Sequence, residues 1–283
     1  MPPADAGVAT VTVGEALRAA GARLAAAGVD TSRLDAEVLL GFVLGVDRGR
    51  LVIDRDAPLP RAAADRFEAL LARREAREPV AYILGRRAFR RLELMVDRRV
   101  LIPRPETELL VEVAGELPEG ARVVDVGTGS GAVALALKDE RPDLVVRGVD
   151  VSADAVAVAR ANGAGLGLDA EFACGDLVGE GPLEADAVLA NLPYVAEGAE
   201  LPPEITRYEP AGALFAGADG LDVVRRLVAL MAGAGGARVG LLALEIGPEQ
   251  ADEVSQMLWD AGFSSVAVRH DLAGLARVVV GTA

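Results

Sequence analysis

From Arg122 onward, short apolar runs of strand type alternate with longer stretches of helical type. Such alternation implies a mainly parallel sheet with helices on both faces, because parallel neighbours need long crossover connections that are usually helical. We expect strands at 122–126, 145–150, 170–173, 185–190, 239–245, 264–269 and 276–280. We expect helices at 131–139, 152–161, 221–231 and 249–261, and a long loop from 194 to about 220. Since only a short loop joins the last two strands, they should form an antiparallel hairpin at the end of a seven-stranded α/β sheet.

The part of the chain before the sheet has a pattern that is typical of helices. Thr12 and Glu15 have the spacing of a capping box, and helical stretches follow as far as Glu78. Pro79 pushes the residue before it out of the helical region, so we expect the last of these helices to end there. Two strand-like runs at 86–90 and 92–96 then favour a hairpin. The sequence predicts three parts: a helical domain at 1–78, a connecting hairpin at 79–103 and an α/β domain at 104–283.

Few residues of this chain can bind a metal or form a disulfide. Cys174 is the sole cysteine and His270 the sole histidine among 283 residues. We therefore expect no disulfide and no metal site, and a reducing compartment such as the cytoplasm. No apolar run reaches the roughly 18 residues that a membrane span needs. The N-terminus has no signal-peptide pattern, so we expect neither export nor a membrane partner.

The charge of the chain is strongly negative and unevenly distributed. The formal net charge of −14 argues against broad affinity for nucleic acid, which requires a positive surface. Between residues 61 and 104, however, twelve arginines stand against six acidic residues. This basic segment is either a solvated face or a docking patch.

A glycine-rich turn follows the first expected strand and is the strongest local signal. It reads Asp125-Val126-Gly127-Thr128-Gly129-Ser130-Gly131. Glycines permit positive φ angles and let a ligand approach the backbone. The spacing G-x-G-x-G differs from the G-x-G-x-x-G of dinucleotide sites, and Asp125 would repel a phosphate. A cation, such as the sulfonium of S-adenosylmethionine, suits this turn better than the pyrophosphate of NAD.

Acidic residues follow the next two expected strands. Asp150 ends the second strand, where its carboxylate can accept hydrogen bonds from both ribose hydroxyls of an adenosine. Asp176 follows the third strand and can accept from the adenine amino group, with Leu177 packing beside the ring. One such residue at each successive strand end favours an adenosyl cofactor.

Asn191-Leu192-Pro193-Tyr194 follows the fourth expected strand. A purely structural interpretation is a turn that ends the strand, since Asn and Pro are common turn residues. Beside a methyl donor, however, the Asn191 side-chain oxygen and the Leu192 carbonyl would each accept one N–H of a planar nitrogen. Pro193 would stiffen this backbone and Tyr194 would pack on the substrate's flat face. Rate would then come from positioning and electrostatics.

From about residue 12 to 280 the chain resembles the HemK/PrmC family of protein-(glutamine-N5) methyltransferases, which act on peptide chain release factors. The stretches that carry the resemblance are 78–85, 101–108, 125–131, 209–214, 217–222, 244–247 and 271–274. The resemblance implies a Rossmann-like methyltransferase domain after a helical domain that docks the substrate. It also implies methyl transfer from S-adenosylmethionine to the glutamine of a Gly-Gly-Gln motif, with S-adenosylhomocysteine as product. Residues that would contact the cofactor are Gly127, Thr128, Gly129, Ser130, Gly131, Asp150, Asp176, Leu177 and Asn191. Residues that would hold the glutamine amide are Asn191, Leu192, Pro193 and Tyr194.

Two residues depart from the family pattern, and two other functions stay open. Leu192 stands where the family usually has proline, and Leu177 where it often has an aromatic residue.

Asn-Leu-Pro-Tyr also resembles the motif of ribosomal RNA adenine dimethyltransferases, so an adenine-N6 methyltransferase acting on RNA or DNA is an alternative. A non-catalytic adenosyl-binding interaction protein is the other. Glu245 lies at the end of the fifth expected strand, and whether it supports the site from there is left open.

Overall fold

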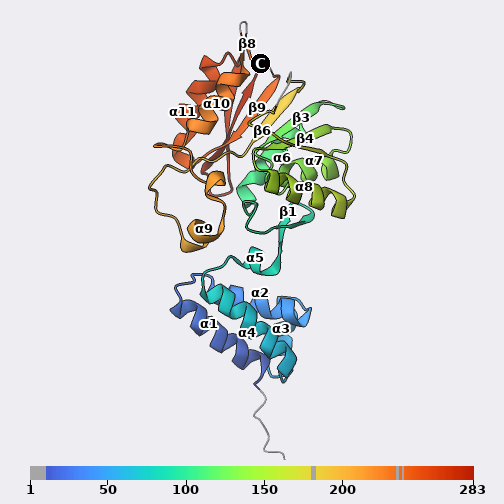
Figure 1. Ribbon diagram of the computed structural model, residues 1–283, viewed down its shortest axis with the longest axis vertical. Helices are drawn as coiled ribbons and strands as arrows, with labels where there is room; N and C mark the ends of the chain where they lie inside the picture. Colours follow the sequence, from blue (N-terminus) through green and yellow to red (C-terminus); the bar gives the residue numbers. More distant parts are fainter. Residues whose placement is uncertain (1–10, 180–182, 234–235, 238) are drawn as a thin grey trace, which may run out of the picture. The chain divides into compact units, whose positions relative to one another are not determined.

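The computed structural model describes residues 11–179, 183–233, 236–237 and 239–283 (Figure 1). The chain divides into two compact units. The helical unit comprises Met1–Gly85 and Pro202–Tyr208, and the sheet unit comprises Arg86–Leu201 and Glu209–Ala283. The hairpin that we expected as a connector therefore belongs to the sheet unit, while a short piece of the long loop belongs to the helical unit.

The helical unit is built from helices, of which α1 and α3 begin with a side-chain cap. They are α1 (Val13–Ala26), α2 (Ser32–Leu44), α3 (Arg48–Ile53), α4 (Arg61–Glu75), α5 (Val80–Leu84) and α9 (Pro203–Tyr208). Thr12 and Glu15 form the predicted capping box of α1. The Asp47 side chain caps α3 by accepting from the Arg50 N–H. Apolar side chains of α1, α2 and α4, such as Leu24, Leu39 and Phe67, form one buried core.

Two helices of the helical unit, α5 and α9, were not expected from the sequence. Pro79 begins α5, and Gly85 ends it in the left-handed conformation after little more than one turn. The helix α9 lies inside the stretch that we expected to be a long loop. Within α9, Glu204 accepts hydrogen bonds from Arg74 at 2.9 Å and from Arg77 at 2.6 and 2.7 Å. A helix this short depends on such long-range contacts, because it is too short to be stable by propensity.

The sheet has seven strands in the order β10-β11-β9-β6-β3-β4-β5, which confirms the predicted α/β class. The strands are β3 (Arg122–Val126), β4 (Val145–Asp150), β5 (Glu171–Cys174), β6 (Ala187–Ala190), β9 (Leu241–Glu245), β10 (Ser265–His270) and β11 (Ala276–Thr282). β3 pairs parallel with β4 and β6, β4 with β5, and β6 with β9. β10 and β11 form the predicted antiparallel hairpin, and β11 also pairs antiparallel with β9.

Helices cover both faces of this sheet (Figure 1). On one face lie α6 (Glu108–Gly115), α7 (Ala132–Glu140) and α8 (Ala153–Leu166), and on the other α10 (Asp222–Met231) and α11 (Ala251–Asp260). Each face buries its own apolar cluster. β1 (Arg86–Phe89) and β2 (Leu92–Met95) pair as the predicted hairpin, which adds Phe89 and Leu94 to the first cluster. The remaining short elements are η1 (Pro105–Thr107), η2 (Ala211–Ala213), η3 (Pro248–Gln250), β7 (Ala232–Gly233) and β8 (Gly236–Ala237).

Arg74 is a buried charge whose partners come from distant parts of the chain. It is 5% exposed and donates to Asp35 and Glu204, both also largely buried. Burial opposes ionisation of Glu204, but hydrogen bonds from Arg77 and Arg74 outweigh it and lower its pKa to about 2. Stabilisation from this ionised carboxylate is therefore present above pH 4.5, its ordinary pKa, and is lost as the pH falls towards 2.

Arg74→Met should destabilise the helical unit by about 3–5 kcal/mol, because it leaves the Asp35 carboxylate buried without its cation, whereas Glu204 keeps Arg77. Urea unfolding followed by circular dichroism measures the loss. Arg61→Met is the matched control at the exposed start of the same helix, and it should change the free energy of unfolding by less than about 0.5 kcal/mol. Equal effects of the two substitutions would contradict a structural role for the Arg74 ion pairs.

Candidate active site

The strand order reverses at β3, and this reversal places the candidate site. The chain runs from β3 outward through β4 to β5, and then returns to the other side of β3 as β6. Ligands of open α/β sheets bind beyond the carboxyl ends of the strands at such a switch point. The glycine-rich turn follows the carboxyl end of β3, and Asn191 follows the carboxyl end of β6. Two segments that are 60 residues apart are thus neighbours.

The backbone of the turn requires its glycines. Gly127, Gly129 and Gly131 have φ angles of 73°, 55° and 80°. A Cβ atom at Gly127 would lie 3.2 Å from the carbonyl oxygen of Asn191, so this glycine also permits the approach of the chain after β6. A Cβ at Gly131 would lie 3.1–3.2 Å from the side chains of Leu135, Phe172 and Ala159. The last glycine therefore serves the packing of α7 on the sheet.

Asp125 holds the turn from inside. It is 2% exposed, and its Oδ2 accepts from the Thr128 hydroxyl at 2.6 Å and from the Ala134 N–H at 3.2 Å. Burial raises the pKa of Asp125 to about 6, although both hydrogen bonds oppose the shift. The carboxyl group lines the cavity described below, but one of its oxygens is already used to clamp the start of α7.

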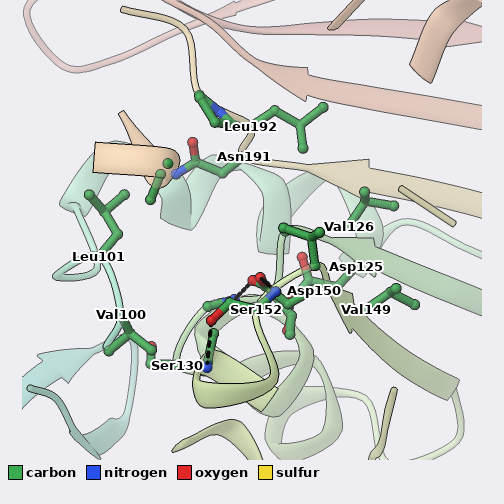
Figure 2. Close-up of a pocket in the computed structure, with 18 of the residues that line it drawn as sticks. Val100, Leu101, Asp125, Val126, Ser130, Val149, Asp150, Ser152, Asn191 and Leu192 are labelled. Carbon is green, nitrogen blue, oxygen red and sulfur yellow. Dashed lines mark hydrogen bonds between the residues drawn. The ribbon is translucent and has the colours of Figure 1, made fainter. Parts of the chain in front are cut away.

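Asp150 closes the turn from the neighbouring strand (Figure 2). Its Oδ2 accepts from the Gly129 N–H and its Oδ1 from the Ser152 N–H, both at 2.9 Å. Each carboxylate oxygen has a second lone pair, so the group can still accept from a ligand diol. Asp176, beyond β5, forms an ion pair with Arg226, which was not among the predicted site residues.

One cavity of about 480 Å³ joins these strand ends, a size typical of small-molecule sites. Most predicted site residues line it: Asp125, Gly127, Thr128, Gly129, Ser130, Asp150, Asp176, Leu177, Asn191, Leu192 and Pro193. Gly131 and Tyr194 are not among its lining residues. Additional lining residues, among them Leu101, Pro103 and Thr107, come from a stretch that had contributed only to the family resemblance.

The Asn191 amide has a defined orientation. Its Nδ2 donates to the Thr107 hydroxyl at 3.0 Å. Within the described part of the chain no donor reaches Asn191 Oδ1, so the oxygen is left for a ligand. This is the orientation that the proposed grip on an N–H requires. Thr107 was missed from the sequence, because nothing in a three-residue helical turn signals a partner 84 residues away.

The next residues of the stretch face different surroundings. Leu192 is 5% exposed and joins the apolar cluster that covers one face of the sheet, with Val126 and Ile246. Its side chain thus anchors the segment by burial where proline would anchor it by a fixed φ. The Tyr194 carbonyl accepts from Gln250 Nε2 at 3.0 Å. Burial, and then the nearby charge of Glu245, raise the pKa of Tyr194 to about 12, so its hydroxyl stays protonated.

Comparison with known proteins gives a consistent family. Residues 15–85 match the PrmC N-terminal domain and residues 105–207 the Methyltransferase small domain. The release factor glutamine methyltransferase of Mycolicibacterium smegmatis is 45% identical over 94% of this chain and 96% of its own length. That of Rhodospirillum rubrum is 40% identical over 98% of this chain and 87% of its own. The chain belongs to the release factor glutamine methyltransferase family.

Solved structures support the methyltransferase fold of this family member. The hMettl16 catalytic domain in complex with MAT2A 3'UTR hairpin 6 superposes with a TM-score of 0.54 at 14% identity, covering 78% of this chain and 82% of that one. A methyltransferase from Pyrococcus furiosus gives a TM-score of 0.50 at 15% identity, covering 76% and 96%. At these identities the likeness establishes the Rossmann-like fold alone.

The basic segment at 61–104 is largely paired with acids of the same chain. Arg90 donates to Glu140 at 2.8 Å and also to Glu112, and Arg91 donates to Asp139 at 3.0 Å. Because these charges are already compensated, the segment as a whole is a poor docking patch. Across the described ranges, no cluster of His, Cys, Asp and Glu suits a metal ion, and no helix is long and apolar enough to cross a bilayer.

Gly131→Ala should lower the free energy of unfolding by about 1–3 kcal/mol, because alanine is strained at a φ of 80° and its Cβ meets three packed side chains. Chemical denaturation of the purified variant measures this loss. Gly115→Ala is the matched control: its Cβ would have open space at the end of α6, and it should be neutral or stabilising by up to about 1 kcal/mol. A Gly131 variant as stable as the control would contradict the packing role.

Proposed function

We propose that this protein transfers a methyl group from S-adenosylmethionine to the side-chain amide nitrogen of a glutamine, the one in the Gly-Gly-Gln motif of peptide chain release factors. The observation that carries the proposal is the orientation of Asn191. Its nitrogen is engaged by Thr107, and its oxygen is left at the wall of a cavity that continues to Asp150. An amide acceptor and an adenosyl group would thus share one cavity. Membership of the release factor glutamine methyltransferase family supports the choice of substrate.

The residues of the cavity fit S-adenosylmethionine. When bound, this cofactor supplies an electrophilic methyl group on a cationic sulfur and leaves as S-adenosylhomocysteine. Asp150 would hold the ribose hydroxyls with the lone pairs that Gly129 and Ser152 leave free. Asp176 would accept from the adenine amino group with the oxygen that Arg226 does not engage. Leu177, 7% exposed and in the left-handed conformation, would pack beside the ring.

The acceptor nitrogen of a glutamine is a poor nucleophile, because its lone pair is delocalised into the carbonyl group. Asn191 Oδ1 and the Leu192 carbonyl would each accept one of its N–H hydrogens and so favour a pyramidal nitrogen. Transfer then forms one N–C bond, breaks one S–C bond and releases one amide proton to solvent. The role of these residues is to position and polarise the amide. Tyr194 would pack on the substrate beyond the cavity wall.

The helical unit is the proposed docking surface for the release factor. It coincides with the match to the PrmC N-terminal domain, which the full-length relatives share. This assignment predicts that the unit contributes to KM for the protein substrate and leaves cofactor affinity unchanged.

The proposal is tested by incubating the protein with methyl-labelled S-adenosylmethionine and either a release factor or ribosomal RNA. We expect label in the release factor, lost when the glutamine of its Gly-Gly-Gln motif is replaced. Label in RNA would favour the adenine-N6 alternative, and label in neither would favour a non-catalytic adenosyl-binding protein. Either result would overturn the proposal.

Asn191→Ala should reduce kcat by about 100- to 1,000-fold, the scale for removing one preorganised polar group from a reacting centre. Affinity for S-adenosylmethionine, measured by calorimetry, should fall only modestly, because the main role of the acceptor oxygen is to hold the substrate amide. Unchanged turnover would contradict the amide grip.

Asp150→Ala should weaken S-adenosylmethionine binding by about 1.5–3 kcal/mol, the scale for losing hydrogen bonds to a charged group. Asp169→Ala is the matched control, since Asp169 is exposed and lies outside the cavity lining. Calorimetry with both variants measures the difference. Native affinity in the Asp150 variant would contradict the ribose assignment.

A further inference from the structure

Glu245 is a buried carboxyl group at the carboxyl edge of the sheet, and the mechanism above does not use it. It ends β9, which pairs parallel with β6 in a register that sets Leu244 opposite Ala190. Glu245 therefore lies beside the point where Asn191 follows β6. It is 2% exposed, and among the described residues its Oε2 has no hydrogen-bond partner. Burying a carboxyl group is costly, which favours a function for it.

Thr107 connects Glu245 to the acceptor site. This residue is 4% exposed and ends η1. Its hydroxyl accepts from Asn191 Nδ2 at 3.0 Å, and its side chain lies near the Glu245 carboxyl group, whose pKa it lowers. A hydroxyl has one hydrogen to donate and can accept others. A hydrogen bond from the Thr107 hydroxyl to Glu245 would join Glu245, Thr107 and Asn191 into one relay from the interior to the cavity.

We propose that Glu245 and Thr107 are positioning residues that hold the Asn191 amide with its oxygen towards the acceptor. An ionised Glu245 can only accept, so it takes the single hydrogen of the Thr107 hydroxyl. Thr107 can then only accept from Asn191, which must present its NH₂ group. A protonated Glu245 frees that hydrogen, and a flipped Asn191 with its oxygen on Thr107 becomes allowed. The inference rests on the proposed function, because it assigns Asn191 Oδ1 to the substrate.

The surroundings of Glu245 let this switch operate near neutral pH. Burial, followed by the charge of Glu106, raises the pKa of Glu245 to about 7, against the Thr107 hydrogen bond and the charges of Arg277 and Arg104. The two cations are shared with other acids. Arg277 donates to Asp271 at 2.8 Å, and Arg104 forms an ion pair with Glu209. Tyr194 also lies near Glu245, and it stays neutral because its pKa is raised to about 12.

The first test uses the pH dependence of kcat for methyl transfer to the release factor. In the native protein kcat should rise with pH through about 7, because the ionised carboxylate enforces the productive amide. Glu245→Gln keeps the size of the side chain but cannot ionise, so this rise of kcat with pH should disappear. If kcat of Glu245→Gln still rises with pH near 7, the proposal is overturned.

Thr107→Val and Thr107→Ser separate hydrogen bonding from packing. Valine keeps the shape without a hydroxyl, so kcat should fall about 10- to 100-fold, the scale for misplacing a reacting group. Serine keeps the hydroxyl and should recover most of the loss, while KM for the release factor stays constant in both variants. Equal kcat values for the valine and serine variants would contradict the positioning role.

A readout independent of catalysis keeps this inference separate from the proposed function. The side-chain ¹⁵N–¹H resonances of Asn191, assigned by their loss in Asn191→Asp, should titrate near pH 7 in the native protein and not in Glu245→Gln. Titration without methyl transfer would support the relay and count against the proposed function. Methyl transfer with pH-independent Asn191 resonances would overturn the relay alone.

Discussion

The parallel pairing of β6 with β3 is the constraint on which the candidate site depends. It sets Ala190 beside Val126, so the chain after each strand leaves the same edge of the sheet side by side. Gly127 permits this closeness, since any Cβ there would meet the Asn191 carbonyl at 3.2 Å. The pairing of β6 with β9 then adds Glu245 on the other side. The glycine-rich turn, Asn191 and a buried acid thus share one edge, although they are far apart in the sequence.

The sheet unit has buried acids with raised pKa values at and beside the cavity, and the nearby arginines are paired. Burial raises the pKa of Asp125 to about 6 and that of Glu245 to about 7. The arginines nearby are paired with other acids, as Arg226 is with Asp176 and Arg104 with Glu209. Because the nearby arginines are paired, they do not oppose the binding of a cationic ligand such as the proposed cofactor.

Much of the fold was predictable from the sequence, because local signals and burial agree there. The bounds of β3 and β4 matched the apolar runs, and the capping box at Thr12 formed as expected. The helix α9 was missed, since its six residues have no pattern of their own and depend on ion pairs between Glu204 and arginines of α4 and the turn after it. At the site, each predicted strand-end residue except Gly131 and Tyr194 lines the cavity. Thr107 could not have been found, because nothing in its short helical turn signals a hydrogen bond to Asn191, 84 residues away.

The central claim is that Asn191 presents an oxygen to the amide of a substrate glutamine. The most direct measurement is tandem mass spectrometry of a release factor after incubation with S-adenosylmethionine and this protein. The account predicts one added methyl group on the side-chain nitrogen of the glutamine in the Gly-Gly-Gln motif, and none when the protein carries Asn191→Ala. A methyl group on any other residue, or equal methylation by the Asn191 variant, would contradict it.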